Sequence, residues 1–189
     1  MKIHRLVLAA CASILAACSN VAVVEHGDAL VSDRLSVQID QPWNRFENSA
    51  AGPIPTWTRE GFTVDALQFF VAVKDGKPIA PARDKAKPMI FRDGMQAHEI
   101  VSLFENFYTQ DGSTFRLDRL APDSFLDGDG FRFEFTRLRK RDDVRLSGVG
   151  WAAVSGGELT AIVFTAPRIH FFGAEIGEVE RLAGSARLR

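Results

Sequence analysis

The stretch that decides the fold is residues 131–165, FRFEFTRLRKRDDVRLSGVGWAAVSGGELTAIVFT. In residues 131–135 phenylalanine alternates with charged residues, which is the period of two that a half-buried β-strand shows. Two further strands are expected at 144–154 and 159–165, because the polar links 139–143 and 155–158 are short enough for hairpin turns. The stretch therefore predicts consecutive antiparallel strands.

Outside this stretch the same alternation predicts strands at 35–39, 66–73 and 115–120. A central helix is expected at about 93–109, starting at Asp93 in capping-box spacing with Gln96. Its apolar stripe consists of Ala97, Ile100, Val101, Phe104 and Tyr108.

A second helix is expected near the C-terminus, at about 174–186, with Ile176, Val179 and Leu182 on one side. Strands outnumber helices and follow one another along the chain. The predicted fold class is therefore α+β: an antiparallel β-sheet with a C-terminal meander, packed by a central helix (about 93–109) and a C-terminal helix (about 174–186).

The N-terminus has the pattern of a secretory signal peptide, a basic head over 1–5 followed by an uncharged apolar segment over 6–17. That segment is shorter than the roughly 20 residues of a bilayer-spanning helix. The tetrad Leu-Ala-Ala-Cys occurs twice, ending at Cys11 and at Cys18. Only Cys18 is preceded by an apolar core of the required length, roughly 7 residues or more.

The tetrad ending at Cys18 resembles the lipobox of bacterial lipoproteins, whose cysteine is lipidated on sulfur and becomes the first residue after cleavage. The resemblance implies a signal peptide at 1–17, a lipidated tether at 18–31 and a single α+β domain at 32–189. Acyl chains such as palmitate would hold the protein on a membrane surface. The open alternative is an ordinary secretory signal, with both cysteines incidental.

Ser19, directly after the cysteine, resembles lipoproteins that are sorted to the outer membrane in enteric-type bacteria. The expected location is therefore the bacterial envelope, lipid-anchored and facing the periplasm. Residues 18–189 carry 21 basic and 24 acidic side chains. That balance argues against nucleic acid as a partner, since nucleic acids are bound by basic surfaces.

Three sequence motifs that are typical of catalytic or metal sites are incomplete in this chain. The Ser155 region lacks the first glycine of a nucleophile elbow. His98-Glu99 lacks the second histidine of a zinc-protease helix, because residue 102 is serine. Asp127-Gly-Asp129-Gly130 lacks the terminal bidentate glutamate of a calcium loop. We therefore expect no catalytic set, no metal site and no cofactor.

Two groups of residues remain as candidate binding sites. The basic run Arg137, Arg139, Lys140 and Arg141 is expected to be a solvated turn, or alternatively a contact for anionic lipid or lipopolysaccharide. The aromatic residues Trp57, Trp151, Phe171 and Phe172 could line a groove or belong to the core.

The order of motifs, from Trp57-Thr-x-x-Gly61 through Gly130-Phe-Arg-Phe133 to Phe164-Thr-Ala-Pro167 and a last helix, resembles uncharacterised proteobacterial lipoproteins. The C-terminal half is also similar to the Mog1/PsbP-like α/β/α sandwich. That second resemblance implies a domain that binds protein partners rather than an enzyme. The expected function is a membrane-tethered periplasmic module that binds an envelope protein or another envelope component; the alternative is a carrier of an apolar ligand such as a lipid.

Overall fold

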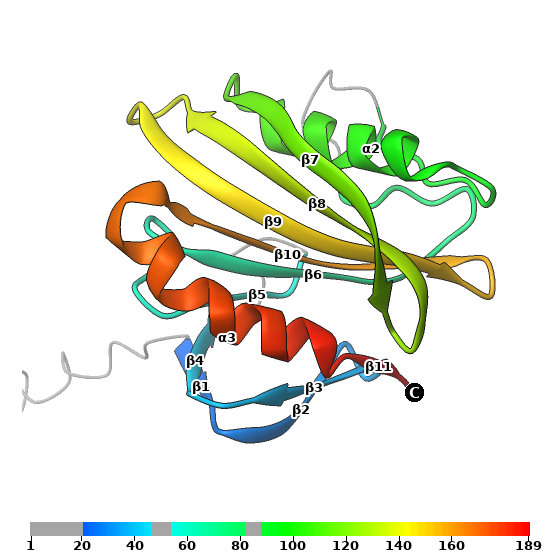
Figure 1. Ribbon diagram of the computed structural model, residues 1–189, viewed down its shortest axis with the longest axis horizontal. Helices are drawn as coiled ribbons and strands as arrows, with labels where there is room; N and C mark the ends of the chain where they lie inside the picture. The colour runs from blue at the N-terminus through cyan, green and yellow to red at the C-terminus, as the bar shows by residue number, and fades with distance from the viewer. Residues whose placement is uncertain (1–20, 47–53, 82–87) are drawn as a thin grey trace, which may run out of the picture.

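The computed structural model describes residues 21–46, 54–81 and 88–189 (Figure 1). Cys11, Cys18 and the predicted signal peptide lie outside the described residues. The larger sheet has eight strands, and every neighbouring pair in it is antiparallel. In spatial order the strands are β1 (Val21–Val24), β4 (Trp43–Phe46), β5 (Thr56–Thr58), β6 (Ala66–Lys74), β10 (Glu158–Pro167), β9 (Val144–Ser155), β8 (Gly128–Arg139) and β7 (Thr114–Phe125).

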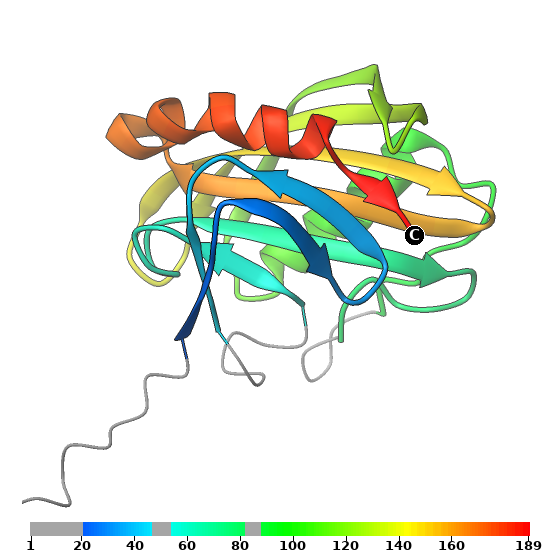
Figure 2. The ribbon, with the colours of Figure 1, turned by 90° about the horizontal axis from the view of Figure 1, so that it is seen from below.

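Two further layers cover the faces of this sheet. Helix α2 (Ala97–Thr109) packs on one face. Helix α3 (Gly173–Gly184) packs on the other, beside a second sheet of three strands (Figure 2): β2 (Gly27–Val31), β3 (Leu35–Ile39) and β11 (Arg187–Leu188). The fold is thus mostly antiparallel sheet with two helices, which confirms the predicted α+β class. Within the described ranges, no helix is long and apolar enough to cross a membrane.

The contact between β8 and β9 sets the shape of the face that α2 covers. Phe133 pairs with Gly150 across the two strands, and Phe135 pairs with Gly148. Both phenylalanine rings lie over the glycines: a Cβ atom at Gly150 would be 2.3 Å from Cζ of Phe133, and one at Gly148 would be 2.2 Å from Cζ of Phe135. Only glycine leaves room for these rings.

Helix α2 packs on the rings of Phe133 and Phe135. The ring of Phe104 stacks on Phe133 with 5.2 Å between centroids, and Tyr108 lies 5.3 Å from Phe135. The buried residues of the helix are Ile100, Val101, Leu103, Phe104 and Tyr108, which is the predicted stripe with Leu103 in place of Ala97.

The helix begins later than the sequence pattern predicts. The prediction starts it at Asp93, whereas the structure starts it at Ala97. Gly94 has a φ of +86°, which a helix cannot accommodate, so residues 92–95 form a turn, closed by a hydrogen bond from the backbone N–H of Met95 to the carbonyl oxygen of Arg92. The capping box exists one turn further along: the backbone N–H of Gln96 donates to Oε2 of Glu99 at 2.7 Å.

The opposite face of the sheet is covered by α3 and β3. Buried side chains of α3, Val179, Leu182 and Ala183, pack in one core with Leu35 and Val37 of β3. The end of α3 is tied to β3 by a hydrogen bond from the backbone N–H of Gln38 to Oγ of Ser185, 2.8 Å long. Both faces of the sheet therefore carry an apolar core.

Several strands differ from the predicted ranges. Strand β7 continues to Phe125, beyond the predicted end at Leu120, although Pro122 lies within it. An edge strand tolerates proline because the backbone N–H groups on its outer side have no neighbouring strand to bond to. β7 is one of the two edge strands of the large sheet. β1 and β2 lie within residues 18–31, the segment expected to be a tether that becomes a strand or an extended entry to the domain.

We predict that Gly150→Ala lowers the free energy of unfolding by about 1–3 kcal/mol, the usual effect of overfilling a packed core. The reason is that the new methyl group overlaps the ring of Phe133, which is fully buried and held by Phe104. Urea unfolding of the two proteins measures the difference. Gly128→Ala is the matched control, since no atom lies within 4 Å of a Cβ there. Equal losses in the two variants would contradict the role assigned to Gly150.

Candidate functional site

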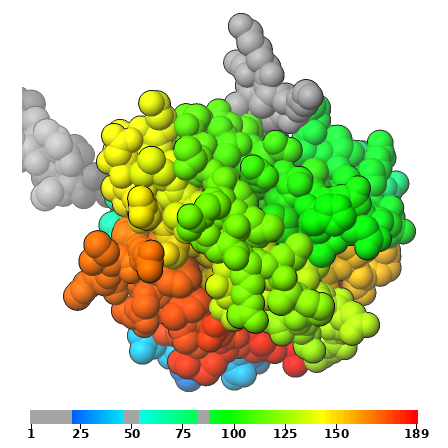
Figure 3. All heavy atoms as spheres, turned by 45° about the horizontal axis from the view of Figure 1, so that its top comes forward, coloured from blue at the N-terminus to red at the C-terminus, as the bar shows by residue number. Residues whose placement is uncertain are grey.

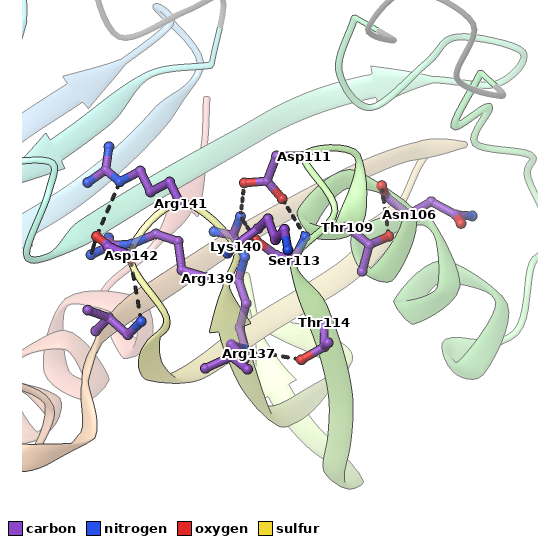
Figure 4. A network of polar contacts seen from close by, with 12 residues as sticks. Asn106, Thr109, Asp111, Ser113, Thr114, Arg137, Arg139, Lys140, Arg141 and Asp142 are labelled. Carbon is purple, nitrogen blue, oxygen red and sulfur yellow. Dashed lines mark hydrogen bonds and ion pairs between the residues drawn. The ribbon is translucent and has the colours of Figure 1, made fainter.

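The predicted basic run lies where β8 turns into β9, and part of it is fixed by acidic partners (Figure 4). Arg139 is buried, and its Nε and Nη2 donate to the two carboxylate oxygens of Asp142, each at 2.8 Å. These hydrogen bonds from Arg139 lower the pKa of Asp142 to about 2. Arg139 is therefore engaged within the hairpin.

Arg137 is engaged in the same way, with the turn that follows α2. Its Nη2 donates to Oδ2 of Asp111 at 2.8 Å and to Oγ of Ser113 at 3.1 Å. Partial burial acts to raise the pKa of Asp111, but hydrogen bonds from Ser113 and the charge of Arg137 outweigh it and hold the pKa below its usual range.

Two cations of the run remain exposed at the tip of the hairpin. Lys140 and Arg141 are exposed, and Arg141 makes only a longer contact of 3.3 Å with Asp142. A surface that contacts an anionic partner would thus use Lys140 and Arg141, while Arg137 and Arg139 hold the hairpin and its neighbours together. The sequence pattern alone treats the four residues as equivalent.

The two tryptophans among the candidate residues are core residues. Trp57 and Trp151 are both buried in the core under α3. The ring of Trp57 meets Phe69 edge to face with 4.5 Å between centroids, and the guanidinium of Arg132 lies 5.4 Å from the centroid of Trp151. The structure does not bring these tryptophans together with Phe171 or Phe172 as exposed residues of one groove.

Phe171 and Phe172 belong to the 168–172 turn (Arg168–Phe172), which links β10 to α3. Phe172 stacks on the buried ring of Phe164 with 5.7 Å between centroids, and this contact anchors the turn to the core. Ile169 is 85% exposed. His170 has φ +79° and ψ −53°, a conformation that is strained for any residue except glycine.

This turn and the β8–β9 hairpin lie at the same end of the sheet, because Pro167 pairs with Leu146 at the start of β9. Figure 3 shows the outer surface of α2 in green and, beside it, the hairpin around residue 140 in yellow.

Strained backbone is commonly found at binding sites. An exposed isoleucine on a strained, anchored turn is therefore a candidate contact for a partner.

A buried polar cluster lies between the loop that follows β5 and the first turns of α3. Its centre is Arg59, which forms an ion pair with Glu178 and places its guanidinium 4.3 Å from the centroid of the Trp43 ring. Buried Asp65 organises the loop by accepting hydrogen bonds from Oγ1 of Thr58 and from the backbone N–H groups of Arg59 and Glu60.

Glu175 completes this cluster and lacks a full set of partners. Its side chain is only 7% exposed, and Oε2 has no hydrogen-bond partner among the described residues. Burial raises its pKa to about 7, and the charge of Asp65 adds to the effect. Arg59 opposes the shift, whereas Glu60 and Glu178 add to it.

Sequence reasoning missed this cluster because Arg59 and Asp65 lie more than one hundred residues before Glu175 and Glu178 in the chain. One signal was present. Counting back from Ala186 through Leu182 and Val179 along the apolar stripe of the last helix leads to Glu175, a carboxylate on the buried face. A charged residue there predicts a buried polar contact.

Asp127, one of the acidic residues of the incomplete calcium-loop motif, has a structural role. Asp127 forms an ion pair with Arg187 of β11, which joins the β7–β8 turn to the small sheet. Over the residues that the structure describes, no group of three or more His, Cys, Asp and Glu side chains could hold a metal ion.

No protein-family model matches the chain, and no curated protein sequence matches it. Among solved structures it is similar to the cyanobacterial PsbP protein, CyanoP, of Synechocystis sp. PCC 6803. The TM-score is 0.60 at 10% sequence identity, over 90% of this chain and 93% of that chain. A protein of Bacteroides thetaiotaomicron is similar with a TM-score of 0.47 and 12% identity, over 88% of this chain and 49% of that chain.

At 10% identity the likeness to CyanoP shows a shared fold and nothing more. It confirms the expected PsbP-like resemblance at the level of the fold. The resemblance to proteobacterial lipoproteins stays a prediction.

We predict that Glu175 makes the stability of the protein fall as the pH rises from 4.5 to 7. In that range the folded protein keeps a proton that the unfolded chain releases, since the pKa is raised from 4.5 to about 7 on folding. The full effect, at most about 3 kcal/mol, is reached above pH 7. Glu175→Gln should therefore be more stable than the wild type at pH 8 and close to it at pH 4.5.

Urea unfolding between pH 4.5 and pH 8 measures the effect, with Glu105→Gln on the exposed side of α2 as the control. If the curves of stability against pH for Glu175→Gln and the wild type run parallel, Glu175 does not titrate in this range.

Proposed function

We propose that the protein is a non-catalytic lipoprotein, anchored through acylated Cys18 to the periplasmic face of the outer membrane, that binds an envelope protein. The anchor is inferred from the apolar segment 6–17 and the Leu-Ala-Ala-Cys tetrad that ends it. The PsbP-like fold is compatible with a binding role but does not establish one.

The observation that carries the binding role is the exposure of Ile169. A single exposed apolar side chain is common on protein surfaces, but this one stands on a strained turn that Phe172 fixes to the core. Because the turn is held in place, a partner would not need to order it on binding, and binding to a preorganised surface is stronger.

The surroundings of Ile169 suggest the chemistry of the partner. Arg168 and His170 beside it are exposed, and the exposed Lys140 and Arg141 lie at the same end of the sheet. A partner that offers an apolar recess bordered by acidic groups would be complementary to this surface. We place the binding surface at this end of the sheet.

The alternative function, a carrier of an apolar ligand, rested on the aromatic content of the chain. Trp57, Trp151 and Phe172 pack against other core side chains, so their aromatic surface is already buried against protein. The binding module is the better supported function.

For the anchor, we predict that Cys18→Ala abolishes incorporation of labelled palmitate and leaves the precursor unprocessed, whereas Cys11→Ala has no effect. The reason is that only Cys18 follows an apolar core of sufficient length. Labelling of cells that express each variant distinguishes them. Normal labelling of Cys18→Ala would contradict the assignment of the anchor.

For the binding surface, we predict that Ile169→Ser weakens capture of the partner about tenfold or more, since burying an isoleucine contributes about 1.5–3 kcal/mol. Crosslinking in cells followed by mass spectrometry identifies the partner, and its recovery is then compared between variants. Leu30→Ser, in β2 of the small sheet at a residue that is 41% exposed, is the control. Equal recovery with both variants, at unchanged thermal stability, would exclude Ile169 as a contact.

A further inference from the structure

Strand β1 is a short edge strand that carries no charge, proline or bulge of the kind that protects many such edges. Among the residues that the structure describes, it pairs with β4 on one side and ends the eight-stranded sheet on the other. Its sequence, Val-Ala-Val-Val, contains no charged residue and no proline. Val21 is 37% exposed and Val23 is 54% exposed, so the strand presents apolar side chains to its surroundings.

The other edge of the same sheet shows the contrast. Strand β7 carries Arg116, Asp118, Arg119 and Asp123, contains Pro122, and has an irregular register near Asp118. Charges, prolines and bulges of this kind prevent an edge strand from pairing with another chain. β1 carries none of these features, so its apolar side chains are open to contact with their surroundings.

The position of β1 in the chain places it next to the proposed lipid anchor. Val21 follows Cys18 by three residues. Three residues of fully extended chain reach about 11 Å at most. An acylated Cys18 sits at the boundary of the hydrocarbon core, and the polar headgroup layer outside that boundary is itself about 5–8 Å thick. The start of β1 is thus held within a few ångströms of the headgroups.

We propose that the exposed edge of β1, with Val21 and Val23, lies against the surface of the phospholipid bilayer that holds the anchor. The inference rests on the proposed acylation of Cys18. Apolar side chains are favoured at the boundary between headgroups and acyl chains. Charged and polar residues, Glu25 and His26, return only after the end of the strand that is remote from Cys18.

This orientation agrees with the proposed binding surface. Val21 pairs with Phe46, whereas Val24 pairs with Trp43 at the other end of β1. Following the register through β5 and β6 to β10 shows that Val24, not Val21, lies toward the end of the sheet where β10 leads into the 168–172 turn. In Figure 2, β1 starts at the lower side and α3 starts at the upper left. The turn follows β10, four strands away from β1 in the sheet, so a bilayer against the edge of β1 leaves the turn accessible.

The test uses the full mature lipoprotein, purified and reconstituted in phosphatidylcholine vesicles. A fluorescent label is attached to Val23→Cys or, as the matched control, to Ser102→Cys on the exposed side of α2. Quenching by aqueous iodide is measured for each label. A label that lies on the bilayer surface can be approached from only one side, so we expect about twofold less quenching at Val23 than at Ser102.

A second variant releases the strand from the membrane. Twelve Gly and Ser residues inserted between Asn20 and Val21 form a flexible linker with a mean span of about 20 Å. With this linker, quenching at Val23→Cys should rise to the level at Ser102→Cys. Equal quenching at the two positions without the linker would overturn the proposal.

Two controls separate the remaining outcomes. Flotation of the labelled proteins with the vesicles reports on the anchor: loss of flotation contradicts the proposed acylation, whereas flotation with an unshielded Val23 contradicts only the contact of β1. The measurement is repeated at several protein-to-lipid ratios. Shielding that disappears on dilution in lipid would show that a second copy covers β1, and would also overturn the proposal.

Discussion

The packing of two phenylalanine rings over two glycines is the contact on which the rest of the structure depends. Phe133 and Phe135 of β8 occupy the space above Gly150 and Gly148 of β9, where other residues would place side chains. Helix α2 packs on these two rings through Phe104 and Tyr108. The position of α2, and with it one of the two cores, follows from the absence of two Cβ atoms.

With both faces of the large sheet covered, the features that distinguish this molecule lie at its ends and edges. The strained 168–172 turn and the exposed cations of the β8–β9 hairpin lie at one end of the sheet, and β1 forms one edge. The two features have opposite requirements. In the proposed function the turn must be accessible to a partner while the apolar edge of β1 is covered, and an anchor on Cys18, three residues before Val21, would satisfy both.

The sequence predicts those parts of the fold that depend on local patterns. Alternating phenylalanines indicate β8, and the apolar stripe with Phe104 and Tyr108 indicates α2. It misplaces the start of α2, because the positive φ of Gly94 is a property of the folded turn. The cluster around Arg59 and Glu175 depends on tertiary contact between distant segments, so the local pattern indicates Glu175 on the buried face of the last helix but not the residues that it meets. Burial likewise separates Arg139 from its exposed neighbours in ways that charge alone does not indicate.

The central claim is that the folded sheet begins three residues after a lipid anchor. Intact-mass measurement of the protein extracted from the membrane fraction of its own cells tests this most directly. The account predicts a chain of residues 18–189 whose mass exceeds that of the polypeptide by a glyceride and acyl chains on Cys18. A chain that begins at another residue, or one that begins at residue 18 without added acyl mass, would contradict it.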